Sequence, residues 1–398
     1  MPEPTPADPT RRRTWRRGTM ATVGSLTLLS GLMVTGAAGA ITIRDNQSYP
    51  AQDAALLTDD GALLDDLAGN LVQVGVGSGI YLGDGWVLSA AHFNPDTGGR
   101  ATVSFESGLT TGGDVFRHPG VAFITDDGGT RQDFTVGNDF ALIQLDTTPT
   151  GLPDVALFGG ASEDLNNQVV TLFGYGATGT GDTGSDSPES TTGTLHAGEN
   201  RVDQVGGSVF NNNETYTDQV VFFDFDRPTG FSDNPLGTRF ALTYESMIAV
   251  GDSGGGLFID NEGTATLTGV HSLLFSPNNA PTAGYGSIGA STTVDGVLGW
   301  IAATTNNAVV QAGDANLNGT VEQGDLNAVL NNWGETDRSW STGDLTDDGN
   351  VDQADLNAVL NNWGASQAPS FEAFTALPEP AFAAASLLGL ASLRRRTR

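Results

Sequence analysis

Short apolar runs, rich in valine, leucine, isoleucine and phenylalanine, follow one another through residues 71–290. Glycine, aspartate or asparagine interrupts them, and the chain holds 54 glycines among its 398 residues. Runs of this length favour strands over helices, and the residues between them are those that form turns. The chain is therefore expected to be mainly β. Its predicted strands lie at 72–76, 80–82, 86–88, 101–105, 121–124, 140–145, 169–173, 219–225, 256–259, 265–270 and 285–290.

A serine ringed by glycines lies between two of these runs. The sequence there is Gly251-Asp252-Ser253-Gly254-Gly255-Gly256. An exposed nucleophile on a tight turn requires such a pattern, because glycine lets main-chain N–H groups converge on an attacked carbonyl. The N–H groups of Gly251 and Ser253 would then form an oxyanion hole. A glycine-rich turn that contains serine can equally be only a turn.

Two further motifs supply partners for Ser253. The run Val-Leu-Ser-Ala-Ala-His at 87–92 ends in His92, and Asn-Asp-Phe-Ala-Leu-Ile-Gln-Leu at 138–145 places Asp139 at the mouth of a strand. The chain order His, Asp, Ser is that of the chymotrypsin-type triad and differs from the orders in subtilisins and α/β-hydrolases. A lone histidine or aspartate at a strand end is usually structural, whereas the three motifs together predict a triad.

On these three motifs the sequence resembles the trypsin-like (chymotrypsin-fold) serine peptidases over residues 41–307. The resemblance implies a double antiparallel β-barrel with the site between the barrels, followed by a helix at the amphipathic segment 294–302. The gap between Asp139 and Ser253 is longer than in a compact member, and we place the excess in a surface insertion over 174–213. Cysteine is absent, with Phe93 where the family usually has one, so packing must stabilise the fold.

The expected chemistry follows from this resemblance and from the triad. His92 would take the hydroxyl proton of Ser253 during attack on a peptide carbonyl and then pass it to the leaving amine. Asp139 would fix the imidazole tautomer. The expected activity is that of a serine endopeptidase that works through an acyl-enzyme and needs no cofactor for catalysis. The alternative is a catalytically inactive trypsin-like domain that acts as a protein-binding module at the cell envelope.

The sequence predicts the substrate specificity less clearly than the triad. The resemblance places Met247 at the base of the specificity pocket, where recognition of Arg or Lys would need an acidic residue, so non-tryptic specificity is expected. His271 falls where glutamate-preferring members carry a pocket histidine, whereas Leu274 is apolar. With Met247, His271 and Leu274 as the pocket residues, both an apolar and an acidic P1 preference stay open. The other two histidines, His118 and His196, are expected to be exposed.

The first 40 residues have the pattern of a signal peptide. Arginines at 11–17 precede an apolar stretch at 19–35 and small residues at 36–40. Cleavage after Ala40 would free Ile41, and in the resembled family a freed aliphatic N-terminus pairs with the aspartate before the catalytic serine, here Asp252. Alternatively, Ile41 merely starts a strand. The protein is expected to be secreted, at a bacterial cell envelope or extracellular.

The net charge narrows the range of partners. The formal charge is −30, and the chain contains no lysine. An acidic surface of this kind argues against nucleic acid or an anionic membrane face, and favours solubility and cation binding. The expected partner is a protein or peptide substrate.

A different pattern begins after residue 307. Residues 325–334 are identical to 355–364, an internal duplication. Each copy closes a loop with oxygen ligands at positions 1, 3, 5 and 12 and glycine at position 6, the arrangement of calcium loops. Helices are predicted at 326–332 and 356–362. The predicted calcium ligands are Asp314, Asn316, Asn318, Thr320, Asp325, Asp344, Thr346, Asp348, Asn350 and Asp355.

The paired loop and helix at 313–366 resemble a dockerin, the small α-helical calcium module that binds cohesin domains. Thr346 is a poor third ligand, so the second site is expected to be weaker. A cohesin partner and docking within the same chain both stay open.

The segment 378–398 closes the sequence. Pro378-Glu379-Pro380, a short apolar stretch and terminal arginines follow one another there, which resembles a PEP-CTERM sorting signal and implies transient membrane anchoring. The apolar stretch is shorter than the roughly 20 residues of a spanning helix. A plain membrane anchor with a positive flank is the alternative.

Overall fold

The structure is a computed structural model of the chain. It describes residues 40–92, 99–126, 129–185, 193–209, 214–229, 233–276 and 281–367. The chain divides into two units, Met1–Leu32 and Met33–Arg398, and every described residue belongs to the second. The signal peptide up to residue 39, the tail at 378–398 and Phe93 lie outside the described residues.

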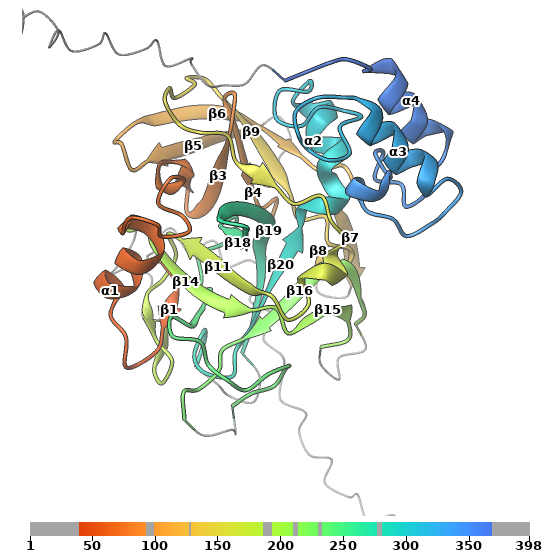
Figure 1. The fold of residues 1–398 in the computed structure, drawn as a ribbon. Coiled ribbons are helices and arrows are strands. Elements are labelled where there is room, and N and C mark those ends of the chain that lie inside the picture. The colour runs from red at the N-terminus through yellow and green to blue at the C-terminus, as the bar shows by residue number, and fades with distance from the viewer. Residues whose placement is uncertain are drawn as a thin grey trace, which may run out of the picture. The chain divides into compact units, whose positions relative to one another are not determined.

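Six antiparallel strands close a barrel in the first half of the described chain (Figure 1). In spatial order they are β2 (Leu71–Val74), β3 (Gly77–Gly83), β4 (Trp86–Ser89), β9 (Ala141–Leu145), β6 (Thr110–Arg117) and β5 (Arg100–Phe105). Five of them coincide with predicted runs. The pattern misses β6 because the buried face of this strand is formed by Thr111 and Gly113 as well as by Val115.

The second half forms an open eight-stranded sheet. In spatial order it contains β14 (His196–Arg201), β11 (Val169–Gly174), β18 (Gly256–Asn261), β19 (Thr264–Phe275), β20 (Ile288–Thr293), β16 (Tyr216–Asp224) and β15 (Gln204–Gly207), and β10 (Ala156–Leu157) pairs in parallel with β19. The strand pairings do not join β14 to β15. The sheet is thus a half-barrel, and together with the closed six-strand barrel it is consistent with the predicted pair of antiparallel β-barrels.

The described residues of 174–213, namely 174–185 and 193–209, do not form the predicted surface insertion. Their described part contributes β12 (Gly179–Thr180), β13 (Gly184–Ser185), β14 and β15, and Ala197, Asn200 and Val202 are buried. Glycine is frequent there because chain segments approach closely: a Cβ on Gly179 would overlap the Gly184 carbonyl. The composition that suggested a loop instead allows tight strand packing.

A small sheet joins the N-terminal part of the described chain to the serine turn. Its order is β13-β12-β1-β17, with β1 (Thr42–Ile43) antiparallel to β17 (Ser246–Met247), and Thr42 lies opposite Met247. Ile41 is fully buried in the same apolar cluster as Met247. The segment after the predicted cleavage point is therefore built into the fold beside Ser253.

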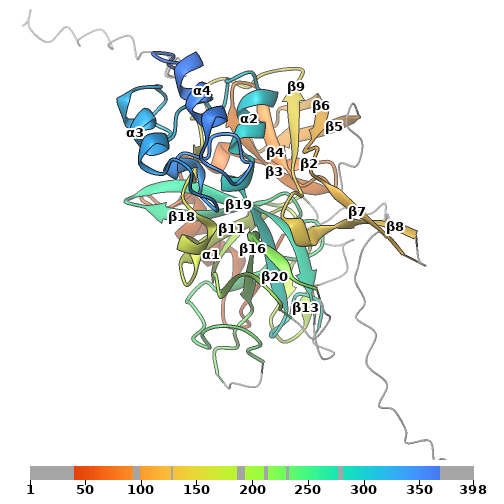
Figure 2. The same cartoon turned by 90° about the vertical axis from the view of Figure 1, so that its right-hand side faces the viewer.

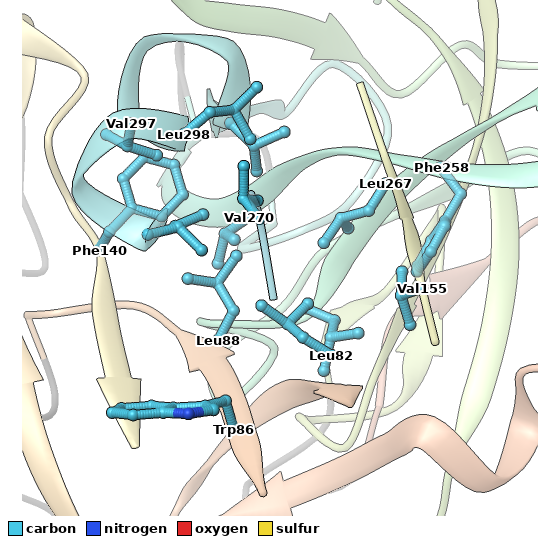
Figure 3. Packing of buried hydrophobic residues seen from close by; sticks show 14 of the residues in the cluster. Leu82, Trp86, Leu88, Phe140, Val155, Phe258, Leu267, Val270, Val297 and Leu298 are labelled. Atoms are coloured by element: carbon cyan, nitrogen blue, oxygen red, sulfur yellow. The ribbon is translucent and has the colours of Figure 1, made fainter. Parts of the chain in front are cut away.

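The largest core cluster spans the barrel and the half-barrel. Figure 3 shows Leu88 and Phe140 from the barrel beside Val270 from β19 and Val297 and Leu298 from the C-terminal helical segment. Packing between the two sheets fixes the strand ends that carry the three predicted catalytic motifs. The remaining strands are β7 (Ala122–Asp126) and β8 (Gly129–Asp133), which form a two-stranded hairpin (Figure 2).

Helices lie mainly at the two ends of the described chain. The predicted helix at 294–302 is observed as η6 (Val294–Val297) followed by α2 (Leu298–Thr304). The other described helical segments are α1 (Tyr49–Asp53), η1 (Ala54–Thr58), η2 (Ala68–Asn70), η3 (Phe134–Val136), η4 (Ser162–Leu165), α3 (Gln323–Asn331), η7 (Trp340–Thr342) and α4 (Gln353–Asn361).

The duplicated segment packs against α2 (Figure 1). Its α3 and α4 begin three residues earlier than predicted. Trp340 is fully buried in the cluster that contains Leu298, and Ser341 N donates to Gly159 O at 2.7 Å. Asp347 accepts from Gly299 N at 2.6 Å, at the start of α2. The segment is thus joined to the preceding domain by apolar packing and by hydrogen bonds.

Candidate active site

His92, Asp139 and Ser253 meet at the junction of the two sheets. His92 Nδ1 lies 2.7 Å from Asp139 Oδ2, and His92 Nε2 lies 2.7 Å from Ser253 Oγ. The strand register explains the first contact, because Ser89 of β4 pairs with Ala141 of β9, just before and after these two residues. Ser253 comes from the turn that precedes β18. The structure therefore brings together the three residues that the motifs predict.

The surroundings of Asp139 set the tautomer of His92. Asp139 is buried and accepts from both the N and the Nδ1 of His92, from Ser272 Oγ and from Gln132 Nε2. Burial alone would raise the pKa of Asp139, but His92 and these donors outweigh it and hold the pKa below its usual value. The proton of a neutral His92 thus belongs on Nδ1, which leaves Nε2 as the acceptor for the Ser253 hydroxyl.

The serine turn is held by Ser78, a residue that the sequence motifs did not indicate. Ser78 N donates to Ser253 O at 2.8 Å, and Ser78 Oγ donates to Gly251 O at 3.2 Å. Gly251 and Gly254 have φ values of 99° and 86°, a region that favours glycine. Within the part of the chain that the structure describes, neither Gly251 N nor Ser253 N has a hydrogen-bond acceptor. Both groups are available to an oxyanion.

Ile41 and Asp252, the predicted activation pair, are in contact. Ile41 N donates to Asp252 Oδ2 at 3.0 Å, and Ala249 N and Gly176 N donate to the same carboxylate at 2.7 Å each. A Cβ on Gly174 or Gly176 would overlap Asp252, so glycine is needed on both sides. Burial raises the pKa of Asp252 to about 7. A cation at Ile41 N would favour the ionised carboxylate.

Of the three predicted pocket residues, Met247 lies on β17, whereas His271 and Leu274 both lie on β19. Met247 is fully buried, and Leu274 pairs with Gly289, where an added Cβ would lie 3.0 Å from the Met247 sulfur. His271 is also buried, with Nδ1 3.0 Å from Ser291 Oγ. Burial lowers the pKa of His271 to about 3, so its ring is neutral near pH 7. Gly289, which the sequence did not indicate, lies next to Phe223 and Met247.

The other two histidines are not solvent-exposed side chains, and both predictions are wrong. His196 Nδ1 lies 2.6 Å from Asp53 Oδ2, with 12% of its side chain exposed. His118 lies edge-on to the ring of Trp300, and burial lowers its pKa to about 4. Each partner comes from a distant part of the sequence, so local context could not reveal it.

The two predicted calcium loops have the same internal hydrogen bonding. Asp314 Oδ2 accepts from Gly319 N at 2.6 Å, and Asp344 Oδ2 accepts from Gly349 N at 2.8 Å. Asp325, which closes the first loop, is fully buried and accepts from Ala315 N at 2.9 Å. Asp355 holds the equivalent place in the second loop, where Leu345 N donates to it at 2.8 Å. The sequence repeat is thus also a structural repeat.

The donor chemistry of these loops suits a hard cation. Burial, then the charge of Asp325, raises the pKa of Asp314 to about 6, and burial with Asp355 does the same for Asp344. Among the described residues no arginine or histidine forms an ion pair with these four carboxylates. Paired, buried carboxylates without a protein cation are stabilised by a bound metal ion.

In the described ranges no group of three or more His, Cys, Asp or Glu side chains is arranged to hold a metal ion. The predicted ligands Asn316, Asn318 and Thr320 in the first loop, and Thr346, Asp348 and Asn350 in the second, would have to supply further oxygens. Calcium coordination therefore stays a prediction.

No helix in the described ranges is long and apolar enough to cross a membrane.

Comparison with known proteins adds one finding. The family model for trypsin matches residues 70–301, which is more than half of the chain. The matched range contains His92, Asp139 and Ser253 and ends before the duplicated segment. A search of curated proteins finds no match.

Proposed function

The chain belongs to the trypsin family and carries a trypsin-like serine peptidase domain, and from this premise we propose that it is a secreted serine endopeptidase with His92, Asp139 and Ser253 as its triad. The observation that carries the proposal is the unbroken contact from Asp139 through His92 to Ser253, with both distances at 2.7 Å. A nucleophile in contact with a base that a third group orients is the arrangement that acyl transfer requires.

The proposed reaction begins when His92 Nε2 accepts the Ser253 hydroxyl proton and Ser253 Oγ bonds to the carbonyl carbon of the peptide. The carbonyl oxygen becomes an oxyanion, which Gly251 N and Ser253 N would stabilise. Collapse of this intermediate breaks the C–N bond, and His92 gives the proton to the leaving amine. Water then attacks the acyl-enzyme by the same route, which releases the acid and restores Ser253.

The proposed activation step is removal of the signal peptide after Ala40. The Ile41 N–H already lies 3.0 Å from Asp252 Oδ2, so a freed amine would be in place to form a buried ion pair. That pair would fix the residue before Ser253, and therefore the orientation of the Gly251 and Ser253 N–H groups.

We propose an apolar P1 preference. Met247 and Leu274 supply apolar surface around Gly289, and the buried His271 is neutral near pH 7, so it offers no positive charge to an acidic side chain. Recognition of a buried substrate carboxylate without a cation would be costly. The acidic alternative is therefore the weaker one.

The duplicated segment at 313–366 is proposed to be a dockerin-like calcium module. Its ten predicted ligands, from Asp314 to Asp355, would hold one ion in each loop. Contacts of Asp347 and Ser341 with the peptidase domain favour docking within the chain. A cohesin-like partner would still find exposed apolar side chains at matching positions in and just after α3 and α4, namely Leu330, Trp333, Leu360 and Trp363.

The proposed location is outside the cytoplasm, at the envelope or in the medium. The proposal rests on the signal-peptide pattern of residues 1–40 and on the sorting-signal pattern of 378–398. The tail would give transient membrane anchoring.

Labelling with a serine-directed fluorophosphonate tests the proposed chemistry. The mature chain that begins at Ile41 should be labelled, Ser253→Ala should not, and Asp139→Asn should be labelled much more slowly because the His92 tautomer is no longer fixed. Peptide libraries would then compare Phe and Leu with Glu at P1. A folded wild-type chain that resists the probe would contradict the proposal and favour the inactive binding domain.

A further inference from the structure

Asp139 has a hydrogen-bond donor that none of the three catalytic motifs contains. Gln132 Nε2 donates to Asp139 Oδ1 at 2.8 Å, and His92 N donates to the same oxygen at 2.9 Å. The other oxygen, Oδ2, accepts from His92 Nδ1 and from Ser272 Oγ. Each carboxylate oxygen therefore has one donor from His92 and one from a side chain of another segment.

The local sequence explains how Gln132 reaches this carboxylate. Asp133, the last residue of β8, accepts from Thr135 N at 3.0 Å and so caps η3. Gly137 ends η3 with a φ of 69°, which returns the chain to Asp139. Gly137 also lies against Gln219 of β16, where a Cβ would overlap the neighbour. The segment from Gln132 to Asp139 is thus fixed near both ends, and the side chain of Gln132 reaches the carboxylate of Asp139.

The same loop also contacts the ring of His92. The centroid of the Phe134 ring lies 5.8 Å from that of His92, in an edge-on orientation. Asp139 itself is buried. A hydrogen bond to a charged group counts for more where water is excluded. The β8–η3 segment therefore combines a polar contact to the aspartate with an aromatic contact to the histidine.

We propose that Gln132 is a positioning residue for the catalytic pair, which fixes the Asp139 carboxylate and disperses part of its charge. The inference rests on the proposed peptidase function. Of the groups that face Asp139, His92 can titrate, whereas Ser272 and Gln132 are uncharged. Without the Gln132 N–H, the carboxylate holds a proton on His92 more tightly, and only His92 and Ser272 still fix its orientation.

The test compares two substitutions in the mature full-length chain. Gln132→Met keeps the length of the side chain without its donor, and Gln132→Ala removes both. Each should lower kcat about 10-fold with KM within about twofold, because one hydrogen bond to a charged group is lost. The acid limb of kcat/KM should move up by about half a pH unit. Gln144→Ala, at an exposed position of β9, is the matched control and should behave as wild type.

The kinetics of the Gln132 variants decide whether Gln132 positions the Asp139 carboxylate. Wild-type values of kcat and of the acid limb in Gln132→Met would overturn the inference, because a packing role alone tolerates methionine. If Gln132→Met folds poorly, the isosteric Gln132→Glu decides: its ionised carboxylate should move the acid limb further upward, and an unmoved limb would overturn the inference as well. Fluorophosphonate labelling of wild type separates this failure from failure of the proposed function.

Discussion

Asp252 shows at the scale of single residues how the backbone shapes the proposed site. Three N–H groups, those of Ile41, Gly176 and Ala249, converge on its carboxylate. They can do so because Gly174 and Gly176 lack side chains that would overlap it. The carboxylate is fully buried, which raises its pKa, so a positive charge at Ile41 N would have a large effect on its ionisation.

Substitution Asp252→Asn tests the activation pair. The mature enzyme should lose about 100-fold or more in kcat/KM, because the amine of Ile41 would be left buried without a counter-charge, at a cost of about 3 kcal/mol or more. Ile41→Val keeps the amine and a branched side chain and should remain within about threefold of wild type. Initial rates on a peptide substrate would measure both. Full activity of Asp252→Asn would show that Ile41 is only the start of a strand.

The sequence could predict that His92, Asp139 and Ser253 meet, because each belongs to a motif with a strong strand or turn context. It could not predict Ser78, Gln132 or Ser272, which form hydrogen bonds with the serine turn or with Asp139. A contact such as that between Ser78 and Ser253 joins residues that are far apart in the chain. The packing of the two sheets decides which polar side chain meets which backbone group. The local sequence pattern does not predict such contacts.

At the scale of elements, prediction worked where apolar residues mark the buried face. The runs that became β4, β9 and β11 were placed within one or two residues. It failed where small or polar residues line that face, as in β6 with Thr111 and Gly113, and in β14 with Asn200. The half-barrel is stabilised by buried polar strands, and β20, which reads Ile-Gly-Ala-Ser-Thr-Thr, is buried throughout.

One end of the half-barrel buries several carboxylates together. Burial and the charge of Asp203 raise the pKa of Asp224, the last residue of β16, to about 9. Burial chiefly, with Asp226 and Asp203, raises that of Glu245 to about 8, and burial raises that of Asp226 to about 6. Backbone groups satisfy part of the cluster, since Leu236 N donates to Asp224 and Asp226 N to Glu245. The folded state therefore binds more protons than the unfolded state.

The stability of the folded chain should fall as pH rises through this cluster. A carboxyl group whose pKa is raised in the folded state stabilises that state fully at pH values below its unfolded-state pKa, near 4. This contribution to the free energy of unfolding is lost as the pH rises to about 9. The pKa of Asp139 is lowered in the folded state, so this group changes the free energy of unfolding only below about pH 4, outside this window. With calcium present, the urea midpoint should be lower at about pH 8.5 than at about pH 5.5, and Asp224→Asn should flatten the slope. A midpoint that rises with pH would contradict this interpretation.

At the scale of the whole molecule, the duplicated module and the peptidase domain share one core. Leu317 and Asp347 occupy the same fourth position of the two loops, and both have left-handed φ values, 54° and 56°. Leu317 lies 3.0 Å from the Cβ position of Gly159, and Asp347 accepts from Gly299 N and Trp300 N of α2. Ordering the two loops with calcium should therefore also hold the last helix of the peptidase domain.

Chelation of calcium should accordingly destabilise the peptidase domain and not the module alone. If calcium is present at about 100 times the Kd of each loop, its removal costs roughly 2.7 kcal/mol per loop, or a fall in Tm of about 5 °C for each ion lost. Calorimetry of the mature chain with calcium and with EDTA would measure the shift, and active-site labelling during heating would report the peptidase domain separately. Asp347→Ala should uncouple the two by removing the contact with α2, whereas Asp337→Ala, an exposed carboxylate of the same module, should leave the coupling intact. The opposite outcome is that EDTA lowers the Tm of a small, separate transition while the labelled peptidase domain keeps its Tm. The module would then be an independent appendage, and the exposed faces of α3 and α4 would be the surface to test for a protein partner.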